Sequence, residues 1–498
     1  MLFNSIEFLI FFPVVVLIYF AIPQRIKNIW LLIASYYFYM CWNAKYALLI
    51  LLSTIITYIS GLLLEKFKNK EWDEKKKRTY KRTVVMLSFF LNLTILFYFK
   101  YVNFALNITT KIFAYMNVQL SVPQFDIMLP VGISFYTFQA LSYTMDVYRE
   151  EIYAEKNFFK YALFVSFFPQ LVAGPIERSK NLLRQLEVSR KFDFEDAKEG
   201  LFLMLWGFFL KLVIADRVAI FVDTVYGDYN TYAGWYLIVA TILFAVQIYC
   251  DFYGYSSIAT GASKVLRIQL MENFDAPYLA SSVSDFWRRW HISLTSWFKD
   301  YLYIPLGGSR KGKVRKYVNK MIVFATSGLW HGAQISFVIW GILNGLYQVI
   351  GEMIQPLRDK AVKWLHLNRS SLGHKLLQVI GTFVLVDFSW IFFRADGVGE
   401  AMKIIRQMFW VKNPWVLFNN ALYDCGLDNK NFNLMLVCIG ILLFADFCKV
   451  KGIQIRKVIL KQDYWFRSLF IICAVMIILI FGIYGSTYNE ANFIYFQF

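Results

Sequence analysis

Two histidines that follow tryptophans are the residues of this chain best suited to acid/base chemistry. The chain has four histidines in 498 residues, and His291 and His331 lie in the segments 286–291 (FWRRWH) and 327–333 (SGLWHGA). Because imidazole exchanges protons near neutral pH, the pair predicts an acid/base site. His291 lies among charged residues, whereas His331 lies in an apolar stretch with small residues. These surroundings predict two depths within one cavity.

The composition predicts an all-α polytopic membrane protein. The chain is 58% hydrophobic and 19% aromatic, and only 17% of its residues are charged. Judged against the ~20 residues needed to cross a bilayer, it holds about 11–13 spanning, tilted and re-entrant helices. The apolar stretches lie near residues 5–22, 28–42, 45–64, 84–104, 129–148, 160–173, 200–226, 233–258, 317–353, 375–394, 433–448 and 466–485.

Basic residues gather in short runs between the apolar stretches, and the net charge is +18. The densest run lies at 65–82, and others lie at 178–198 and 310–316. This distribution is typical of cytoplasmic loops and excludes a nucleic-acid partner. We interpret the runs as topology signals that contact anionic lipid headgroups; the alternative is that they hold an anionic cytoplasmic donor.

The six cysteines lie mostly in or beside apolar stretches, without any CxxC spacing. They predict small buried side chains, and neither a disulfide framework nor a zinc site. They are Cys41, Cys250, Cys425, Cys438, Cys448 and Cys473.

Two local patterns concern the histidine segments. Between residues 284 and 300, Trp287, His291, Leu294 and Phe298 recur at helical spacing, which predicts one amphipathic interfacial helix with His291 on its apolar face. Asp285 and Arg289 are spaced to pair on the other face.

Small residues recur in the apolar stretch that contains His331. Gly328, Gly332 and Ser336 predict a ridge that a second helix or a ligand approaches closely, and Gly341 and Gly345 repeat the pattern. In the segment 167–175 (FFPQLVAGP), two prolines and a glycine predict a bend or a re-entrant piece.

Several blocks resemble the membrane-bound O-acyltransferase family, most closely its bacterial branch that O-acetylates alginate and peptidoglycan. The three strongest are 286–297 (FWRRWHISLTSW), 300–308 (DYLYIPLGG) and 328–333 (GLWHGA). Further blocks in the same order are 129–139 (LPVGISFYTFQ), 170–176 (QLVAGPI), 251–256 (DFYGYS) and 493–498 (FIYFQF).

The resemblance implies one membrane domain over residues 1–498, with the signature blocks in an approximate core at 120–355, and helices arranged as a funnel around a central tunnel. It implies that His331 is the catalytic histidine and that His291 lies near the cytoplasmic mouth. The expected substrate- or tunnel-lining residues are Trp287, Arg288, Arg289, Trp290, Trp330, Asp251, Tyr255, Asn344 and Gln139.

Polar residues inside apolar stretches have two interpretations. Each is either an interhelical hydrogen-bonding group or part of the site, and Asp251 in particular is placed to line the tunnel or orient an imidazole. They are Gln139, Asp146, Gln247, Asp251, Asn344 and Asp387.

The resemblance also implies the reaction. Acetyl-CoA is the expected donor, no cofactor is expected to be bound, and the acetyl group crosses the bacterial cytoplasmic membrane to an exported polysaccharide, such as peptidoglycan or an alginate-like polymer. A separate extracytoplasmic transferase is an expected partner, and membrane lipid is another.

Three alternatives remain open. D-alanyl transfer toward teichoic acid from a carrier-protein thioester is the nearest. A proton-coupled transporter or flippase would also show intramembrane carboxylates, although no inverted repeat is visible. A membrane scaffold without catalysis would not need His331.

The charge distribution generates a topology prediction. Cysteine introduced at Lys76 or Lys313, in a chain whose six native cysteines are replaced, is expected to resist a membrane-impermeant maleimide in intact cells and to react after permeabilisation. Labelling of either position in intact cells would contradict the cytoplasmic assignment of the basic runs.

Overall fold

The computed structural model describes residues 1–498 except 120–121, 124, 173, 485–493 and 495–498. Over the described residues its secondary structure is helical, without a β-strand, so the predicted all-α class is confirmed. The chain forms two compact units, Met1–Met204 with Ala259–Met271 and Leu205–Ile258 with Glu272–Phe498. The expectation of one membrane domain with a core at 120–355 stays a prediction.

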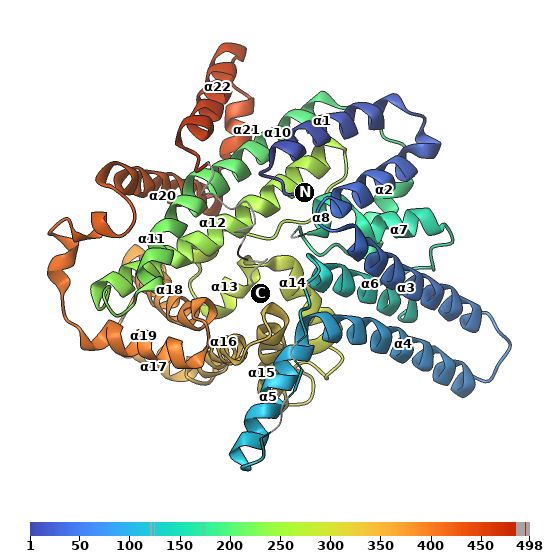
Figure 1. The fold of residues 1–498 in the computed structure, drawn as a ribbon, viewed down its shortest axis with the longest axis horizontal. Coiled ribbons are helices and arrows are strands. Elements are labelled where there is room, and N and C mark those ends of the chain that lie inside the picture. Colours follow the sequence, from blue (N-terminus) through green and yellow to red (C-terminus); the bar gives the residue numbers. More distant parts are fainter. Residues whose placement is uncertain (120–121, 124, 173, 485–493, 495–498) are drawn as a thin grey trace. The chain divides into compact units, whose positions relative to one another are not determined.

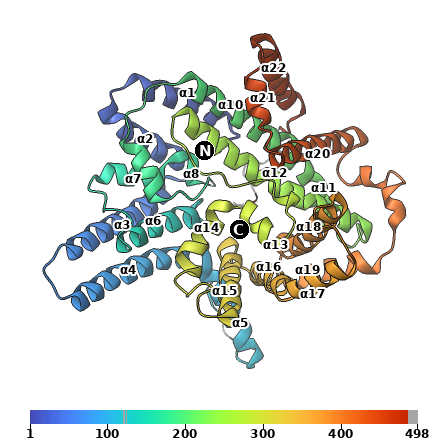
Figure 2. The ribbon, with the colours of Figure 1, turned by 180° about the vertical axis from the view of Figure 1, so that it is seen from behind.

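The first unit holds the N-terminal helices, coloured blue to green in Figure 1. They are α1 (Ile6–Ala21), α2 (Gln24–Met40), α3 (Ala47–Lys68), α4 (Glu74–Leu96), α5 (Val102–Tyr115), α6 (Ile133–Tyr148), α7 (Phe158–Ser166), α8 (Phe168–Leu171), α9 (Ser179–Glu187) and most of α10 (Phe194–Phe208). Helices α3, α4 and α6 pack side by side, as both views show (Figures 1 and 2).

The second unit begins within α10 and includes most of α12 (Trp235–Val265), whose last residues belong to the first unit. Its other helices include η3 (Phe209–Ala215), α11 (Asp216–Gly227), α13 (Val283–Arg289), α14 (Ile292–Phe298), α15 (Lys313–His331), α16 (Ile335–Met353), α17 (Gln355–Trp364), α18 (Leu372–Arg394), α19 (Val398–Trp410), α20 (Asn429–Val450), α21 (Ile455–Leu460) and α22 (Tyr464–Phe481).

Seven helical segments of the described chain are long and apolar enough to cross a membrane. They are Ala44–Lys68, Glu74–Tyr115, Trp235–Val265, Ile335–Met353, Leu372–Arg394, Asn429–Val450 and Tyr464–Phe481. Only 6% of the most apolar window of Tyr464–Phe481 is buried by protein, and such an apolar helix is stable where lipid covers it. The chain is therefore a multi-pass membrane protein. The larger predicted set, about 11–13 segments, also counted tilted and re-entrant pieces shorter than a full span.

Exposed apolar helices also explain an error about the cysteines. Cys250, Cys425, Cys438 and Cys448 are buried as predicted, but Cys41 and Cys473 are exposed. Cys473 lies on α22, whose surface is largely uncovered by the rest of the protein. Apolar sequence context therefore predicted an apolar environment, which is not the same as burial inside the protein.

The segment with two prolines breaks the helix, as predicted. α7 ends at Ser166, and α8 is a single short turn with Pro169 in its first positions. At Gly174 a Cβ atom would lie 2.4 Å from the Cα of Gln170, so the chain turns back on itself more tightly than a side chain allows. Ala173 lies outside the described residues.

The apolar stretch 317–353 is a hairpin of two helices and not one element. α15 ends at His331 and α16 begins at Ile335, so the expected ridge of Gly328, Gly332 and Ser336 does not lie on a single helix. The glycines instead allow the two helices to touch: a Cβ at Gly328 would lie 2.2 Å from the Phe337 carbonyl oxygen. Backbone contact of this kind fixes α15 on α16.

Gly341 provides a test of this packing. In Gly341→Ala the new methyl group would lie 2.2 Å from the Phe324 carbonyl oxygen, and overpacking of this kind costs about 1–3 kcal/mol. We expect a lower apparent melting temperature for the purified protein in detergent. Gly351→Ala, on the same helix with nothing within 4 Å of the added atom, is the matched control and should melt no lower than the wild type. Equal melting of both variants would show that the close contact is not required.

Candidate functional site: two adjacent histidines

His291 lies at a break between two short helices. The expectation of one amphipathic helix over 284–300 is wrong, because α13 ends at Arg289 and α14 begins at Ile292. His291 has a φ of +44°, in the left-handed region that non-glycine residues rarely adopt. Its side chain therefore does not continue the face that carries Trp287. The predicted pair on the other face is present, with Arg289 Nε 3.1 Å from Asp285 Oδ1.

Asn273 stabilises this break. Its backbone oxygen accepts a hydrogen bond from the N–H of Ile292 (3.0 Å), and its side-chain oxygen accepts one from the N–H of Ser293 (3.2 Å). These N–H groups open α14 and have no partner within the helix. A side chain from another part of the chain thus caps α14 directly after His291, which the local periodicity could not predict.

His331 is the last residue of α15. Gly332 follows in an extended conformation, with a φ of −155°, and its N–H donates to the Gly328 oxygen. A Cβ at Gly332 would lie 2.2 Å from the Phe337 ring. The absence of a side chain at residue 332 therefore lets the hairpin turn directly after the histidine.

The two imidazoles are neighbours. Their ring centroids lie 6.3 Å apart, with an angle of 60° between the ring planes, and the two residues are 0% and 4% exposed for His291 and His331. The rings are thus adjacent rather than at two separated depths. Both residues belong to the second unit, so the contact between the rings lies within one unit.

Aromatic rings surround the pair. Phe252 lies 4.7 Å from the His291 ring, and Trp330 lies 6.0 Å from His291 and 4.9 Å from His331. Two further rings cover His331, Trp340 at 5.0 Å and Phe393 at 5.6 Å. Such an environment strengthens electrostatic interactions, because little water is present to screen them.

Burial changes the proton affinity of His291, which lies outside the seven candidate spans. Desolvation lowers the pKa of His291 from its usual value to about 3. The ring is therefore neutral at pH 7, with one nitrogen a donor and the other an acceptor. A neutral ring is the form that can accept a proton or orient a polar group.

Asn344 links three helices behind the histidine pair. Its side-chain oxygen accepts a hydrogen bond from Trp287 Nε1 (3.1 Å), and its Nδ2 donates to the Trp340 carbonyl oxygen (2.9 Å) and to Ser389 Oγ (3.1 Å). α13, α16 and α18 are thereby joined at the level of Trp340, which packs on His331. The interhelical interpretation of Asn344 accounts for these bonds.

Tryptophans connect the two histidine segments. The ring of Trp290 lies 5.3 Å from that of Trp390, which stacks on Trp340 at 5.5 Å. Trp340 in turn contacts His331.

Arg288 is exposed on α13.

Asp251 takes part in a buried ion-pair cluster. Its Oδ1 lies 2.7 Å from Lys211 Nζ, which is also 2.9 Å from Asp216 Oδ1, and its Oδ2 accepts a hydrogen bond from the N–H of Ile494 (2.8 Å). The residue that follows it on α12, Phe252, contacts His291. Of the block 493–498, Ile494 alone lies within the described residues.

Several important residues were missed from the sequence. Lys211 had a signal, because a lysine inside the apolar stretch 200–226 needs a partner. The aromatic neighbours of the histidines had none, since the chain holds many aromatic residues of the same type. They are Phe252, Trp340 and Phe393, and Trp390 stacks on Trp340 behind them.

The other expected polar residues are distributed over both units. Tyr255 and Gln247 are buried on α12, and Asp387 lies on α18. In the first unit, Gln139 Nε2 donates to the Phe164 carbonyl oxygen (2.5 Å), and Asp146 accepts a hydrogen bond from Ser179 Oγ (2.6 Å). Gln139 therefore already serves an interhelical contact within its own unit.

The chain matches the membrane-bound O-acyltransferase family over residues 38–375, a range that contains both histidines. The chain belongs to this family. It is an O-acyltransferase, as the resemblance of its sequence blocks predicted. The transporter and scaffold alternatives are therefore set aside.

Individual relatives refine the comparison. The chain is 35% identical over 412 residues to the probable alginate O-acetylase of Pseudomonas syringae pv. tomato, covering 82% of this chain and 75% of the relative. It is 32% identical over 440 residues to the peptidoglycan O-acetyltransferase of Helicobacter pylori, covering 82% and 80%. It is 25% identical over 291 residues to the teichoic acid D-alanyltransferase of Bacillus subtilis, covering 54% and 70%.

The burial of His291 in this acyltransferase generates a pH prediction. In ¹⁵N-histidine spectra of the purified protein, the His291 signal is assigned by its loss in His291→Gln. Its chemical shift should remain that of a neutral imidazole from about pH 8 to pH 5. Free histidine in the same tube is the control and should titrate. Titration of His291 within this range would show that water reaches the ring.

The sign for stability follows from the same pKa. Because the folded-state pKa is about 3 and an exposed histidine titrates near ~6.5, the unfolded chain binds the proton more tightly. The contribution of neutral His291 to the free energy of unfolding is therefore fully present above about pH 6.5, and it is lost as the pH falls toward 3.

Proposed function

We propose that this O-acyltransferase moves an acetyl group from cytoplasmic acetyl-CoA across the bacterial cytoplasmic membrane, for O-acetylation of an exported or cell-wall polysaccharide. The single observation that carries the proposal is the adjacency of two buried imidazoles within an aromatic enclosure. The names of the Pseudomonas and Helicobacter relatives support acetyl as the acyl group and a polysaccharide as the final acceptor.

His331 is the proposed general base. In its neutral form the imidazole accepts the proton of an acceptor hydroxyl while the hydroxyl oxygen bonds to the thioester carbonyl carbon. The carbon–sulfur bond then breaks, and the imidazolium returns the proton to the leaving thiolate. General base catalysis provides roughly 10²- to 10⁴-fold, so positioning of the reactants must provide much of the remaining acceleration.

His291 is the proposed second member of the site. As a neutral ring beside His331 it can donate or accept one hydrogen bond without adding charge, which fits a role in holding the donor thioester. The exposed Arg288 on the preceding helix supports contact with an anionic donor. The remaining expected lining residues, including Tyr255 and Trp330, stay predictions.

A second candidate acyl group is D-alanyl, delivered from a carrier-protein thioester toward teichoic acid. The match to the Bacillus subtilis D-alanyltransferase favours keeping it as an alternative. That match covers a smaller part of the chain than the acetylating relatives do. We therefore prefer acetyl transfer, with a separate extracytoplasmic transferase as the proposed partner.

His331→Ala provides the main test. In a deletion strain complemented with this variant, polysaccharide ester should fall to the level of the empty strain, since loss of the base removes about 10²- to 10⁴-fold of rate. Ester released from cell wall and exopolysaccharide is measured by mass spectrometry, which also distinguishes acetyl from D-alanyl. His366→Ala, at an exposed histidine, is the matched control and should keep full activity at equal protein abundance.

Binding measurements separate the two histidines. Purified His331→Ala should retain binding of acetyl-CoA, whereas His291→Ala should weaken binding or slow transfer without always abolishing it. His331→Gln guards against a folding defect, because it keeps more of the buried volume. Wild-type ester in His331→Ala would end the assignment of the base. Loss of donor binding in His331→Ala, with binding kept and turnover lost in His291→Ala, would reverse the two roles.

A further inference from the structure

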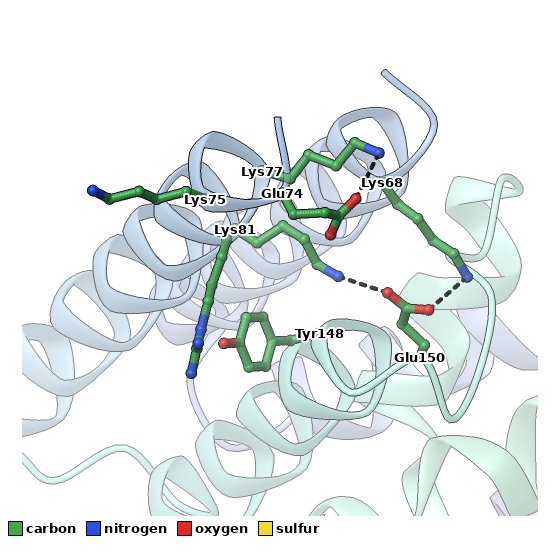
Figure 3. A pocket seen from close by; sticks show the side chains of 8 residues that line it. Lys68, Glu74, Lys75, Lys77, Lys81, Tyr148 and Glu150 are labelled. Carbon is green, nitrogen blue, oxygen red and sulfur yellow. Dashed lines mark hydrogen bonds and ion pairs between the residues drawn. The ribbon is translucent and has the colours of Figure 1, made fainter. Parts of the chain in front are cut away.

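A cavity of about 750 Å³ lies at one end of the bundle formed by α3, α4 and α6. It is lined by cationic residues, two glutamates and a tyrosine, and Figure 3 shows these side chains. They are Lys68, Glu74, Lys75, Lys77, Arg78, Lys81, Tyr148 and Glu150. The lining belongs entirely to the first unit, whereas the histidines belong to the second.

The cavity carries excess positive charge. Five cationic side chains line it against two carboxylates. Lys77 pairs with Glu74 at 3.1 Å, and Glu150 lies 3.0 Å from Lys68 and 2.8 Å from Lys81 (Figure 3). Within the described chain, Lys75 and Arg78 form no ion pair with a carboxylate. Their charges are available to an anionic ligand.

Glu150 occupies a position where an anionic ligand would meet two lysines. Hydrogen bonds from Lys81 and Lys68 hold the pKa of the Glu150 carboxyl below its usual value. It is therefore ionised at neutral pH and neutralises part of the cavity. Half-exposed ion pairs of this kind exchange readily with a competing anion, because each contributes little free energy.

The cavity is built on fixed contacts. At Gly61 of α3 a Cβ would lie 2.6 Å from the Tyr143 hydroxyl of α6, and Ser53 Oγ donates to Asn92 Oδ1 at 2.6 Å to join α3 and α4. Glu65 Oε2 accepts a hydrogen bond from the N–H of Ala154, in the loop that follows Glu150. The three helix ends that carry the lining residues are thus held in place by close packing and by hydrogen bonds.

Aromatic residues indicate the depth of this cavity in the membrane. It lies where the candidate span Ala44–Lys68 ends and the candidate span Glu74–Tyr115 begins. Beside it, Trp72 packs 5.5 Å from Phe67 and 4.8 Å from Tyr80. Tryptophan and tyrosine gather at the headgroup layer of bilayers. The cavity therefore opens where lipid phosphates are concentrated.

We propose that this cavity is a binding site for the phosphate headgroup of an anionic phospholipid. Lys75 and Arg78 provide the first charges that the phosphate meets, and Lys68 and Lys81 become available as Glu150 is displaced. Basic cavities between membrane helices bind such headgroups by this chemistry. The inference does not depend on which acyl group the enzyme transfers.

The test uses the full-length protein in neutral detergent and measures binding of short-chain phosphatidylglycerol by native mass spectrometry. Lys75→Gln with Arg78→Gln should weaken binding on the order of ten- to thirtyfold, because each surface charge contributes about 1 kcal/mol. These side chains are exposed, and their removal leaves the ion pairs of Lys68, Lys77 and Lys81 in the cavity intact.

Lys66→Gln with Arg82→Gln is the matched control. Lys66 is exposed on α3 and Arg82 is exposed on α4, and neither residue lines the cavity. Their replacement removes the same charge as the replacement of Lys75 and Arg78. This variant should change the affinity less than about threefold, since screening at physiological salt acts over about 8 Å. Glu150→Gln should shift affinity in the opposite direction and tighten binding. Short-chain phosphatidylcholine should bind weakly to every variant.

Three outcomes would overturn the proposal. Equal weakening in both double variants would show unspecific attraction to the whole basic hairpin. Weaker binding in Glu150→Gln would show that the carboxylate organises the cavity instead of competing with the ligand. A third outcome is that the binding of free coenzyme A depends on Lys75 and Arg78 while the binding of phosphatidylglycerol does not. That result would assign the cavity to a soluble nucleotide phosphate.

Discussion

The contact between the His331 ring and Trp340 is the interaction on which the arrangement of the site depends. Trp340 is held from behind by stacking on Trp390, and its carbonyl oxygen accepts a hydrogen bond from Asn344. Because these contacts involve two long helices, α16 and α18, His331 packs against a surface that cannot shift independently. His291 then takes its position relative to that surface, 6.3 Å away. A rigid aromatic wall suits a reaction in which orientation contributes more than one proton transfer does.

Two backbone features bring the rings together. The hairpin turn after His331 needs a residue without a side chain at 332, and the break at His291 needs a left-handed backbone conformation that Asn273 stabilises from a distance. A φ near +44° at a histidine costs of order 1–3 kcal/mol. Such strain persists because the neighbouring helix start, hydrogen-bonded to Asn273, fixes the following residues.

The sequence predicted the class of the protein and its family, because hydropathy and long ordered motifs are local signals. The catalytic roles of the two histidines stay predictions. It did not predict helix ends. The stretch 317–353 is predominantly apolar, and the small residues around its turn at Gly332 fitted a ridge on one helix as well as they fit a hairpin. The apparent helical periodicity across 284–300 ignored Asn273, whose side chain interrupts it through a tertiary hydrogen bond. Tertiary contacts of this kind override local periodicity.

The buried cluster of Lys211, Asp216 and Asp251 has a structural role that its ion pairs define. A lysine between two carboxylates is costly to bury and is seldom a net source of stability. Its geometry is nevertheless specific: Asp251 joins α12 to η3 through Lys211 and accepts a hydrogen bond from Ile494. The adjacent residue, Phe252, contacts His291. A rotation or slide of α12 would therefore break the ion pair between Asp251 and Lys211 and move the Phe252 ring away from His291 at the same time. The cluster thus fixes the register of the helix that closes the histidine site.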